Sequence, residues 1–188
     1  NNARLGVGMQ GVSIAEAATQ HAIAYAVGRK QGKTPVEGGS GTIVDHADVR
    51  RMLMSMKAET FAARALALDC AAASDMARAT GDEGWRARAA FLTPICKAYG
   101  TDTGIKVAET GIQVHGGMGF IEETGAAQFL RDVRVTAIYE GTNGIQAMDL
   151  VARKMMDGGA AAFALLDQIE AVAASSDLGA PLTRAVAE

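Results

Sequence analysis

The sequence predicts an all-α fold: an up-down four-helix bundle with an additional C-terminal helix. Composition is the first reason, because Ala is abundant, Pro occurs only 3 times and aromatic residues make up 5% of the 188 residues. Such a composition favours closely packed helices over sheets. Pattern is the second reason, because apolar residues recur at three- and four-residue steps over long stretches, as on one face of a helix. No segment alternates convincingly enough to predict a strand.

Three long helices come first in the predicted bundle. Apolar stripes at helical spacing run through residues 3–30, 46–80 and 85–114. Glycine-containing breaks separate these stretches, as expected for turns between antiparallel helices. Asp45 is placed to cap the second helix, and Pro94 inside the third is a candidate for a kink.

The second half of the chain predicts shorter elements. Residues 115–125 are interpreted as a Gly-rich loop, 126–133 as a short helix and 134–141 as connecting chain. A fourth helix is expected from Thr142 to about Met156. One more amphipathic helix is expected over residues 160–174.

Length and charge bound the domain organisation and the function classes. The length suits one domain, with residues 1–156 as the bundle and 157–188 as the start of a C-terminal extension, expected to be partly disordered. The net charge of −3 offers no basic surface for nucleic acid. No stretch approaches the roughly 18 consecutive apolar residues that a membrane span needs, and no signal peptide opens the chain. These features predict a cytoplasmic protein of bacterial type, without a membrane span or nucleic-acid partner.

Neither the cysteines nor the histidines predict a metal site. Cys70 and Cys96 lie within helical patterns and are interpreted as small buried hydrophobic residues, with a disulfide or metal role as the minor alternative. His21, His46 and His115 are far apart in the chain and lack partners at metal-ligand spacing.

Residues 6–11 match the dinucleotide-binding pattern G-x-G-x-x-G. That pattern binds a nucleotide where it follows a strand and opens a helix. Here it lies inside the first predicted helix, with no apolar strand before it. We therefore interpret its glycines as small residues that let two helices pack closely.

The residues that indicate chemistry lie around Glu140, at the end of a largely apolar run. A carboxylate beside apolar residues is partly desolvated and becomes a stronger base, an effect that a helix N-terminus opposes. Gly141 lets a ligand approach the backbone closely, and Thr142 suits an N-cap. The residues alone leave two structural alternatives open, because Glu140 in this position can cap the helix or lie solvated in a loop.

Four short motifs, in matching order and spacing, resemble segments of the acyl-CoA dehydrogenases. They are Arg29-Lys30-Gln31-Gly32-Lys33, Gln113-Val114-His115-Gly116-Gly117-Met118-Gly119-Phe120, Leu130-Arg131-Asp132-Val133-Arg134, and Tyr139-Glu140-Gly141-Thr142 followed by Ile145-Gln146. The resemblance covers about residues 1–156 and implies the C-terminal helical domain of that family. The loop 34–42 and the string 45–53 look like a branch of longer members that includes the 3-methylthiopropanoyl-CoA dehydrogenases.

The resemblance implies α,β-dehydrogenation of an acyl-CoA thioester, in which Glu140 removes the α-proton and a hydride passes to FAD. It also implies electron-transfer flavoprotein or a similar acceptor as a partner, and a homo-oligomer, either dimer or tetramer. Family members also have an N-terminal helical domain and a central β-domain, which do not fit in 188 residues. The isolated chain is therefore expected to be folded but inactive, with little or no bound FAD.

The resemblance also assigns site residues by matching position. Substrate contacts fall to Asn1, Arg4 and Gly141. Contacts with FAD fall to Arg29, Gln113, Gly117 and Thr142, the first three reaching the cofactor from a neighbouring subunit. No metal is implied. Some members carry their base directly before the equivalent of Arg4, where this chain has Ala3, so Glu140 is left alone in that role.

The chain also departs from the family pattern. No Phe stands between Gln31 and Gly32, Ala47 takes the place of a Gln expected to contact FAD, and Gly144 replaces another Gln. These departures concern FAD binding rather than the glutamate. Two alternatives stay open: a flavin monooxygenase of the same fold, a group that generally lacks this glutamate, and a helical assembly domain without catalysis.

Overall fold

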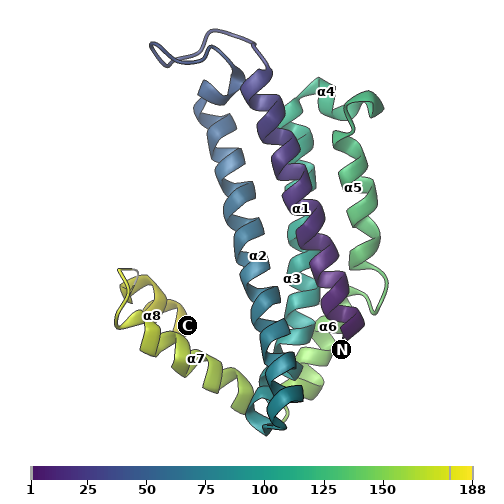
Figure 1. Cartoon of the computed structure of the whole chain (residues 1–188), viewed down its shortest axis with the longest axis vertical. Helices are drawn as coiled ribbons and strands as arrows, with labels where there is room; N and C mark the ends of the chain where they lie inside the picture. Colours follow the sequence, from purple (N-terminus) through teal and green to yellow (C-terminus); the bar gives the residue numbers. More distant parts are fainter. Residues whose placement is uncertain (1, 178, 188) are drawn as a thin grey trace.

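Three long antiparallel helices form the body of the molecule (Figure 1). The computed structural model describes residues 2–177 and 179–187, which contain no strand. The long helices are α1 (Asn2–Gly28), α2 (Ala47–Thr80) and α3 (Glu83–His115). Their bounds lie within a few residues of the predicted stripes, and the predicted all-α class is confirmed. Pro94 lies inside α3, which continues without a break.

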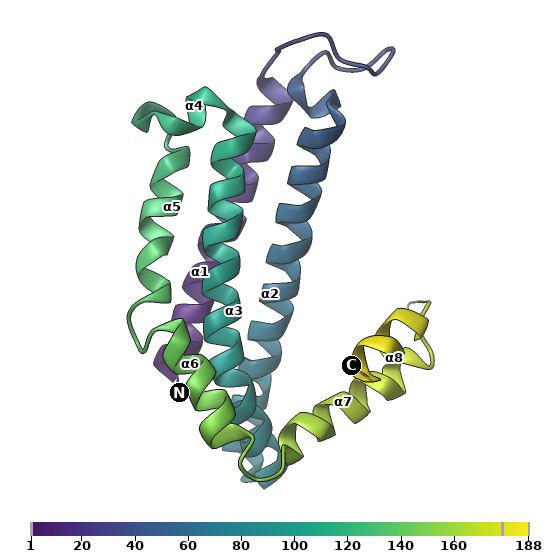
Figure 2. The same cartoon turned by 180° about the vertical axis from the view of Figure 1, so that it is seen from behind.

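The fourth position of the bundle is shared by two shorter helices. Helix α5 (Ala126–Arg134) runs beside α1 and α3, and α6 (Asn143–Asp149) packs against α3 near the N-terminal end of α1 (Figure 2). The single helix predicted over residues 142–156 is thus only half regular. After α6 the chain forms a π-helical turn, Leu150–Lys154, in which the backbone bonds lengthen to i→i+5.

Helical turns also fill segments that were predicted to be irregular. Helix α4 (Gly117–Phe120) and a 3₁₀ turn at Glu122–Thr124 occupy the Gly-rich segment, and a second 3₁₀ turn, Val135–Ala137, follows α5. Helix α7 (Ala160–Ala173) matches its predicted range, and α8 (Gly179–Ala187) follows it. Together α7 and α8 form an arm that leaves the end of the bundle where α6 lies (Figure 1). The expected partial disorder of residues 157–188 stays a prediction.

The loop before α2 corrects one predicted cap. Asp45 lies in a 3₁₀ turn, Ile43–Asp45. The N-cap of α2 is His46, whose side chain makes no capping hydrogen bond to the helix. The Asp45 carboxylate instead accepts hydrogen bonds from the Gly41 amide (2.8 Å) and the Ser40 hydroxyl (3.0 Å). The Asp45 carboxylate therefore stabilises the loop that precedes α2. It does not cap the helix, because it is bound by these two loop donors instead of by the helix amides.

Helices α1 and α3 pack unusually closely along a line of glycines. A Cβ atom added at Gly11 would lie 2.3 Å from the carbonyl oxygen of Gly100, and one at Gly100 would lie 2.7 Å from that of Gly8. At Gly104 it would lie 2.7 Å from the Gly11 carbonyl oxygen. Backbone therefore meets backbone, which only residues without a side chain allow. The interpretation of the G-x-G-x-x-G pattern as a packing device is confirmed for Gly8 and Gly11, but not for Gly6, where an added Cβ atom would meet no described atom within 4 Å.

The rest of the core is built from small and medium apolar side chains. Cys70 and Cys96 are free and fully buried, as predicted.

In the described part of the chain, no group of three or more His, Cys, Asp or Glu could hold a metal ion. None of the described helices combines the length and the apolar character that crossing a membrane requires.

Candidate active site

Glu140 lies in a turn with unusual backbone geometry, between the 3₁₀ turn Val135–Ala137 and α6. Its φ angle is +54°, and that of Gly141 is +83°. Within residues 2–177 and 179–187, Glu140 is the one residue other than Gly with a positive φ. A left-handed conformation costs a residue with a Cβ atom about 1–2 kcal/mol, and such strain persists where the surrounding structure holds it. Strained residues of this kind cluster at functional sites.

The start of α6 fixes the far side of this turn. Thr142 is the N-cap, as predicted, and its hydroxyl accepts a hydrogen bond from the Ile145 amide at 3.4 Å. Asn143 is tied to α3, because its side-chain oxygen accepts a 2.8 Å bond from the ammonium group of Lys97. The Asn143 amide nitrogen donates to Asp102 at 2.7 Å. The helix that follows Glu140 is therefore anchored to α3, the central helix of the bundle.

Lys97 is fully buried, which is rare for a lysine. Burial lowers the pKa of its ammonium group, and the negative charge of Asp102 opposes that shift. A buried charge is stable in a fold where it is hydrogen-bonded and where an opposite charge lies near it. Asn143 supplies the hydrogen bond and Asp102 supplies the charge, so these three residues form one polar unit beneath α6.

Gln146 connects the turn to α1. Its amide nitrogen donates hydrogen bonds to the carbonyl oxygens of Glu140 (3.2 Å) and Gly141 (2.9 Å). Its amide oxygen accepts a 3.1 Å bond from Arg4. Arg4 in turn forms an ion pair with Asp149 at 2.8 Å. Arg4, predicted to contact the substrate, is thus joined to the Glu140 segment through one intervening side chain.

Asp149 anchors this connection inside the protein. It is 7% exposed and pairs with both Arg4 and Arg153, each at 2.8 Å. Burial would raise the pKa of Asp149, but the bond from Arg4 and the nearby positive charges outweigh it, so the pKa is lowered. The carboxylate therefore stays ionised and holds the Arg4 guanidinium in place.

Two open hollows adjoin the Glu140 turn. One, of about 350 Å³, lies between α1 and the segment that ends at Tyr139, and it has apolar walls that include Met9, Ile14 and Val135. The other, of about 490 Å³, lies between α3 and the start of α6, with Thr142 and Arg134 in its wall. Either hollow gives a ligand access to the residues next to Glu140.

A second group of predicted residues lies at the opposite end of the bundle. Arg29 and Gln113 line a cavity of about 360 Å³, together with His115 and Gly116. His115 is 4% exposed; its Nδ1 bonds the Gly111 carbonyl at 2.7 Å, while its Nε2 has no hydrogen-bond partner. Burial lowers the pKa of His115, although the bond to Gly111 opposes this shift. The wall of the cavity therefore combines a cation, an amide and a largely buried imidazole ring.

The three glycines beside this cavity have different reasons to be glycine. Gly116 has a φ of +60°, which favours glycine. At Gly119 a Cβ atom would lie 2.3 Å from the carbonyl oxygen of Ile112. Gly117 has neither reason, because its φ is not positive and a Cβ atom there would meet nothing within 4 Å. Contacts among the described residues do not account for a glycine at this position.

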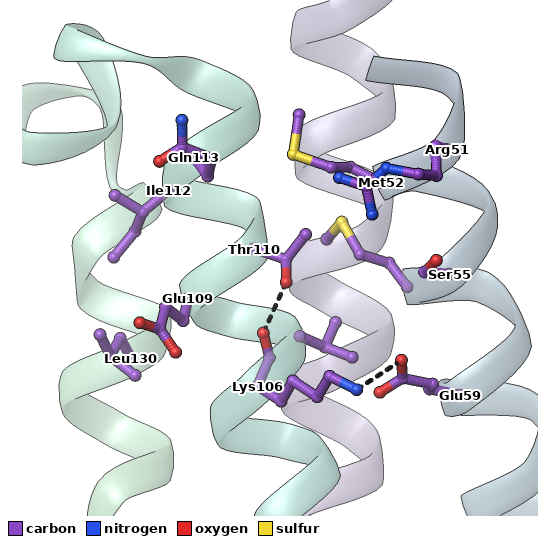
Figure 3. Close-up of a pocket in the computed structure, with 12 residues that line it drawn as sticks. Arg51, Met52, Ser55, Glu59, Lys106, Glu109, Thr110, Ile112, Gln113 and Leu130 are labelled. Atoms are coloured by element: carbon purple, nitrogen blue, oxygen red, sulfur yellow. Dashed lines mark hydrogen bonds and ion pairs between the residues drawn. The ribbon is translucent and has the colours of Figure 1, made fainter. Parts of the chain in front are cut away.

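A further cavity, of about 640 Å³, is a groove beside α2 and α3 (Figure 3). Its wall includes Arg51 and Glu59 of α2 and Lys106 of α3, and the Lys106–Glu59 ion pair of 2.9 Å crosses it. Gln113 lies at one end of the labelled residues and also lines the Arg29 cavity. The groove and the cavity thus meet at one of the predicted FAD contacts.

The predicted site residues therefore fall into two groups. Arg4, Glu140, Gly141 and Thr142 lie at the α6 end, whereas Arg29, Gln113 and Gly117 lie at the α4 end. Arg4 and Arg29 are roughly 37 Å apart at 1.5 Å of helix rise per residue. Asn1 lies outside the described residues.

Sequence reasoning missed the residues that hold the turn. Gln146 had been noticed in its motif without a role, and Asp149, Asn143 and Lys97 had not been singled out. A signal existed for Lys97, because a lysine on the buried stripe of a helix needs a partner. The bonds of Gln146 to backbone carbonyls leave no pattern in a sequence.

The chain matches known proteins in sequence and in fold. Residues 1–156 match the family model described as "Acyl-CoA dehydrogenase, C-terminal domain". The 3-methylmercaptopropionyl-CoA dehydrogenase of Ruegeria pomeroyi is 46% identical over 195 residues, covering 100% of this chain and 33% of that protein. The chain thus spans about a third of the length of this relative.

Two solved structures share the fold. The butyryl-CoA dehydrogenase of Megasphaera elsdenii is 30% identical, with a TM-score of 0.66 over 79% of this chain and 35% of that one. A chain in the structure of the electron transferring flavoprotein of Acidaminococcus fermentans is 25% identical, with a TM-score of 0.66 over 81% of this chain and 36% of that one. The chain therefore belongs to the acyl-CoA dehydrogenase family, of which it forms the C-terminal helical domain.

Proposed function

We propose that this domain serves a flavin-dependent acyl-CoA dehydrogenase that oxidises the α,β-bond of an acyl-CoA thioester, with Glu140 as the base for the α-proton. The observation that carries the proposal is the strained Glu140–Gly141 turn, held by buried polar residues at the head of α6. Such a strained turn is typical of a position where the side chain has a function.

Proton removal next to a thioester carbonyl needs a base in contact with the carbon and a site that excludes water. The Glu140 carboxylate takes the proton, and donors aimed at the thioester oxygen stabilise the negative charge that develops there. The missing side chain at Gly141 leaves room for the thioester beside the backbone. FAD, when bound, supplies the hydride acceptor, which is chemistry that no side chain of this domain could provide.

The residues at the α4 end fit a dinucleotide. Arg29 offers a planar cation for a pyrophosphate, and Gln113 offers a polar contact. Gly117 leaves its backbone open to a ligand. Because Arg29 lies roughly 37 Å along α1 from Arg4, at the opposite end of the bundle from Glu140 (Figure 1), one chain is not expected to present both groups to the same flavin. We therefore propose that Arg29, Gln113 and Gly117 contact the FAD of a neighbouring subunit.

A surface stripe on α2 supports a homo-oligomer, either dimer or tetramer. Met54, Phe61 and Leu68 are exposed and stand seven residues apart, on one face of the helix. Large exposed apolar side chains repeated along one face of a helix are typical of a surface that another protein covers. A second copy of the chain would satisfy both this stripe and the two-ended arrangement of the proposed FAD contacts.

The related proteins indicate a first substrate and a class of electron acceptor to test. The 46%-identical relative is a 3-methylmercaptopropionyl-CoA dehydrogenase, so that thioester is the first substrate to test. One related chain occurs in a structure of an electron transferring flavoprotein, and we propose an acceptor of that class as the partner that removes the electrons.

The proposal is tested by adding acyl-CoA thioesters, without oxygen, to the full-length protein that carries this domain. We expect the visible absorption of bound FAD to bleach with 3-methylmercaptopropionyl-CoA, and a 2,3-enoyl-CoA product to form. The isolated 188-residue chain is expected to stay colourless and inactive, because only part of the proposed flavin site lies in it. A full-length protein that holds FAD but is not reduced by any thioester would contradict the proposed activity.

Gly117 offers a separate test of the FAD site. Gly117→Ala is expected to leave the stability of the domain unchanged or slightly raised, because the added methyl group meets nothing within the chain and Ala favours a helix. The full-length variant is nevertheless expected to lose FAD, measured as the flavin-to-protein absorbance ratio after dilution. Gly6→Ala, also free of contacts within 4 Å, is the matched control and should retain FAD. Equal retention by both variants would argue against a ligand at Gly117.

A further inference from the structure

The left-handed conformation at Glu140 requires a restraint, because the residue has a Cβ atom and would relax if it were free. The turn is exposed at Glu140 itself, so packing around the side chain does not supply the restraint. What the structure provides is a pair of hydrogen bonds to the carbonyl oxygens of Glu140 and Gly141, on either side of the Gly141 Cα. Both come from the same atom, Nε2 of Gln146.

The orientation of the Gln146 amide is determined by its partners. Arg4 can only donate hydrogen bonds, and the two backbone carbonyls can only accept them. The oxygen of the amide must therefore face Arg4 (3.1 Å), and the nitrogen must face the turn (3.2 and 2.9 Å). Gln146 is 2% exposed, so water does not compete freely for these bonds. In the reversed orientation the amide nitrogen would face the Arg4 donor, and the amide oxygen would face the two carbonyl acceptors.

The other end of the connection is also fixed. Asp149 is buried and holds Arg4 by an ion pair of 2.8 Å, so the Arg4 head cannot move freely away from Gln146. Gly141 leaves space for the contact, because a Cβ atom there would lie 2.9 Å from Nε2 of Gln146. A continuous path of polar contacts thus runs from the buried Asp149 through Arg4 and Gln146 to the carbonyls of the turn.

We propose that Gln146 is a positioning residue for catalysis, which holds the Glu140–Gly141 backbone so that the carboxylate is presented to the substrate. The inference rests on the proposed function, in which Glu140 is the base. Gln146 contacts no reacting atom in this scheme. It acts through Glu140, because the carbonyls that it binds set the direction in which the Glu140 side chain leaves the backbone.

Two substitutions in the full-length enzyme test this role. Gln146→Met keeps the length of the side chain and removes all three hydrogen bonds. Gln146→Glu keeps an acceptor for Arg4 but has no donor for the carbonyls, so it separates the bond to α1 from the bonds to the turn. Thr93→Val is the control, because Thr93 is 2% exposed and the bonds of its hydroxyl, to the Ala89 carbonyl and toward Cys70, do not involve Asp149, Arg4 or Gln146.

The measurement is the rate of flavin reduction by 3-methylmercaptopropionyl-CoA, resolved into kcat and KM, with thermal unfolding and FAD content recorded for each variant. Both Gln146 variants are expected to lose about 100-fold in kcat, the effect of misplacing a catalytic group by about 1 Å, with little change in KM. Thr93→Val is expected to lose stability and keep its kcat. A merely structural role for Gln146 would make its variants behave like Thr93→Val.

The outcomes distinguish this inference from the proposed function. Glu140→Gln is assayed in parallel; if it retains activity, the assignment of the base fails. If Glu140→Gln is inactive while Gln146→Met or Gln146→Glu retains the wild-type kcat, the positioning role of Gln146 is overturned and the base assignment stands. Should Gln146→Met fold poorly, Gln146→Glu decides alone, since it retains the partner of Arg4.

Discussion

Glu140→Gln in the full-length protein is expected to slow flavin reduction by acyl-CoA by about 10²–10⁴-fold, the usual contribution of a general base. The carboxamide has the size of the carboxylate but cannot accept the α-proton. Because the substitution leaves the backbone carbonyls of residues 140 and 141 in place, the bonds from Gln146 should persist. FAD content and thermal stability are therefore expected to match those of the wild type. The rate is measured by rapid mixing without oxygen, following the visible flavin absorption.

A second substitution at the same position separates strain from chemistry. Glu140→Gly also removes the base, but it relieves the positive φ of 54°, which costs a residue with a side chain about 1–2 kcal/mol. Glu140→Gly should thus be at least as stable as Glu140→Gln while being as inactive. A Glu140→Gln variant that still reduces its flavin at the wild-type rate would show that the proton leaves by another route.

The body of the fold could be predicted because its determinants are local. Each long helix carries its own apolar stripe, so spacing alone places α1, α2 and α3 within a few residues. The short elements depend on packing instead. Whether residues 117–120 form a loop or a turn of helix is decided by Gly119 lying against the Ile112 carbonyl, a contact between segments that no periodic pattern records.

The candidate site divides in the same way. Glu140 and Thr142 could be identified because their motif is contiguous, and the structure shows the turn and the N-cap around them. The restraint on that turn comes from Gln146, whose amide is oriented by Arg4, 142 residues away in the chain. Asp45 illustrates the same limit over a short range, because competing donors at Gly41 and Ser40 take the carboxylate that was expected to cap α2.

Gly11→Ala is expected to cost the domain about 3 kcal/mol of unfolding free energy or more, at the upper end for an overpacked core. The added methyl group would lie 2.3 Å from the carbonyl oxygen of Gly100 and 2.8 Å from the Thr101 Cα atom. Both obstacles are backbone atoms of α3, so no side-chain rotation can relieve the overlap. Helices α1 and α3 have to move apart, which opens the core along the whole line of glycines.

Gly6→Ala, on the same helix, is expected to change the free energy of unfolding in the opposite direction. Nothing lies within 4 Å of a Cβ atom at Gly6, and Ala is favoured over Gly in a helix by about 1 kcal/mol. This variant should therefore be more stable than the wild type. Chemical denaturation of the isolated domain, followed by helical circular dichroism, measures both changes, and the unfolding temperature should shift by roughly 2–4 °C per kcal/mol for a chain of this size. Equal effects of the two substitutions would show that α1 and α3 are not in backbone contact.

The same substitution links the packing of the bundle to the candidate site. Gly11 stands about two turns after Arg4 on α1, so a displacement of α1 from α3 also moves Arg4 away from Gln146 and Asp149. Gly11→Ala, if it still folds, should therefore lose flavin-reduction rate as well as stability in the full-length enzyme, whereas Gly6→Ala should not lose stability. The glycines that resemble a nucleotide-binding pattern would then act on catalysis without touching a nucleotide, by fixing how closely α1 approaches the helix that anchors the Glu140 turn.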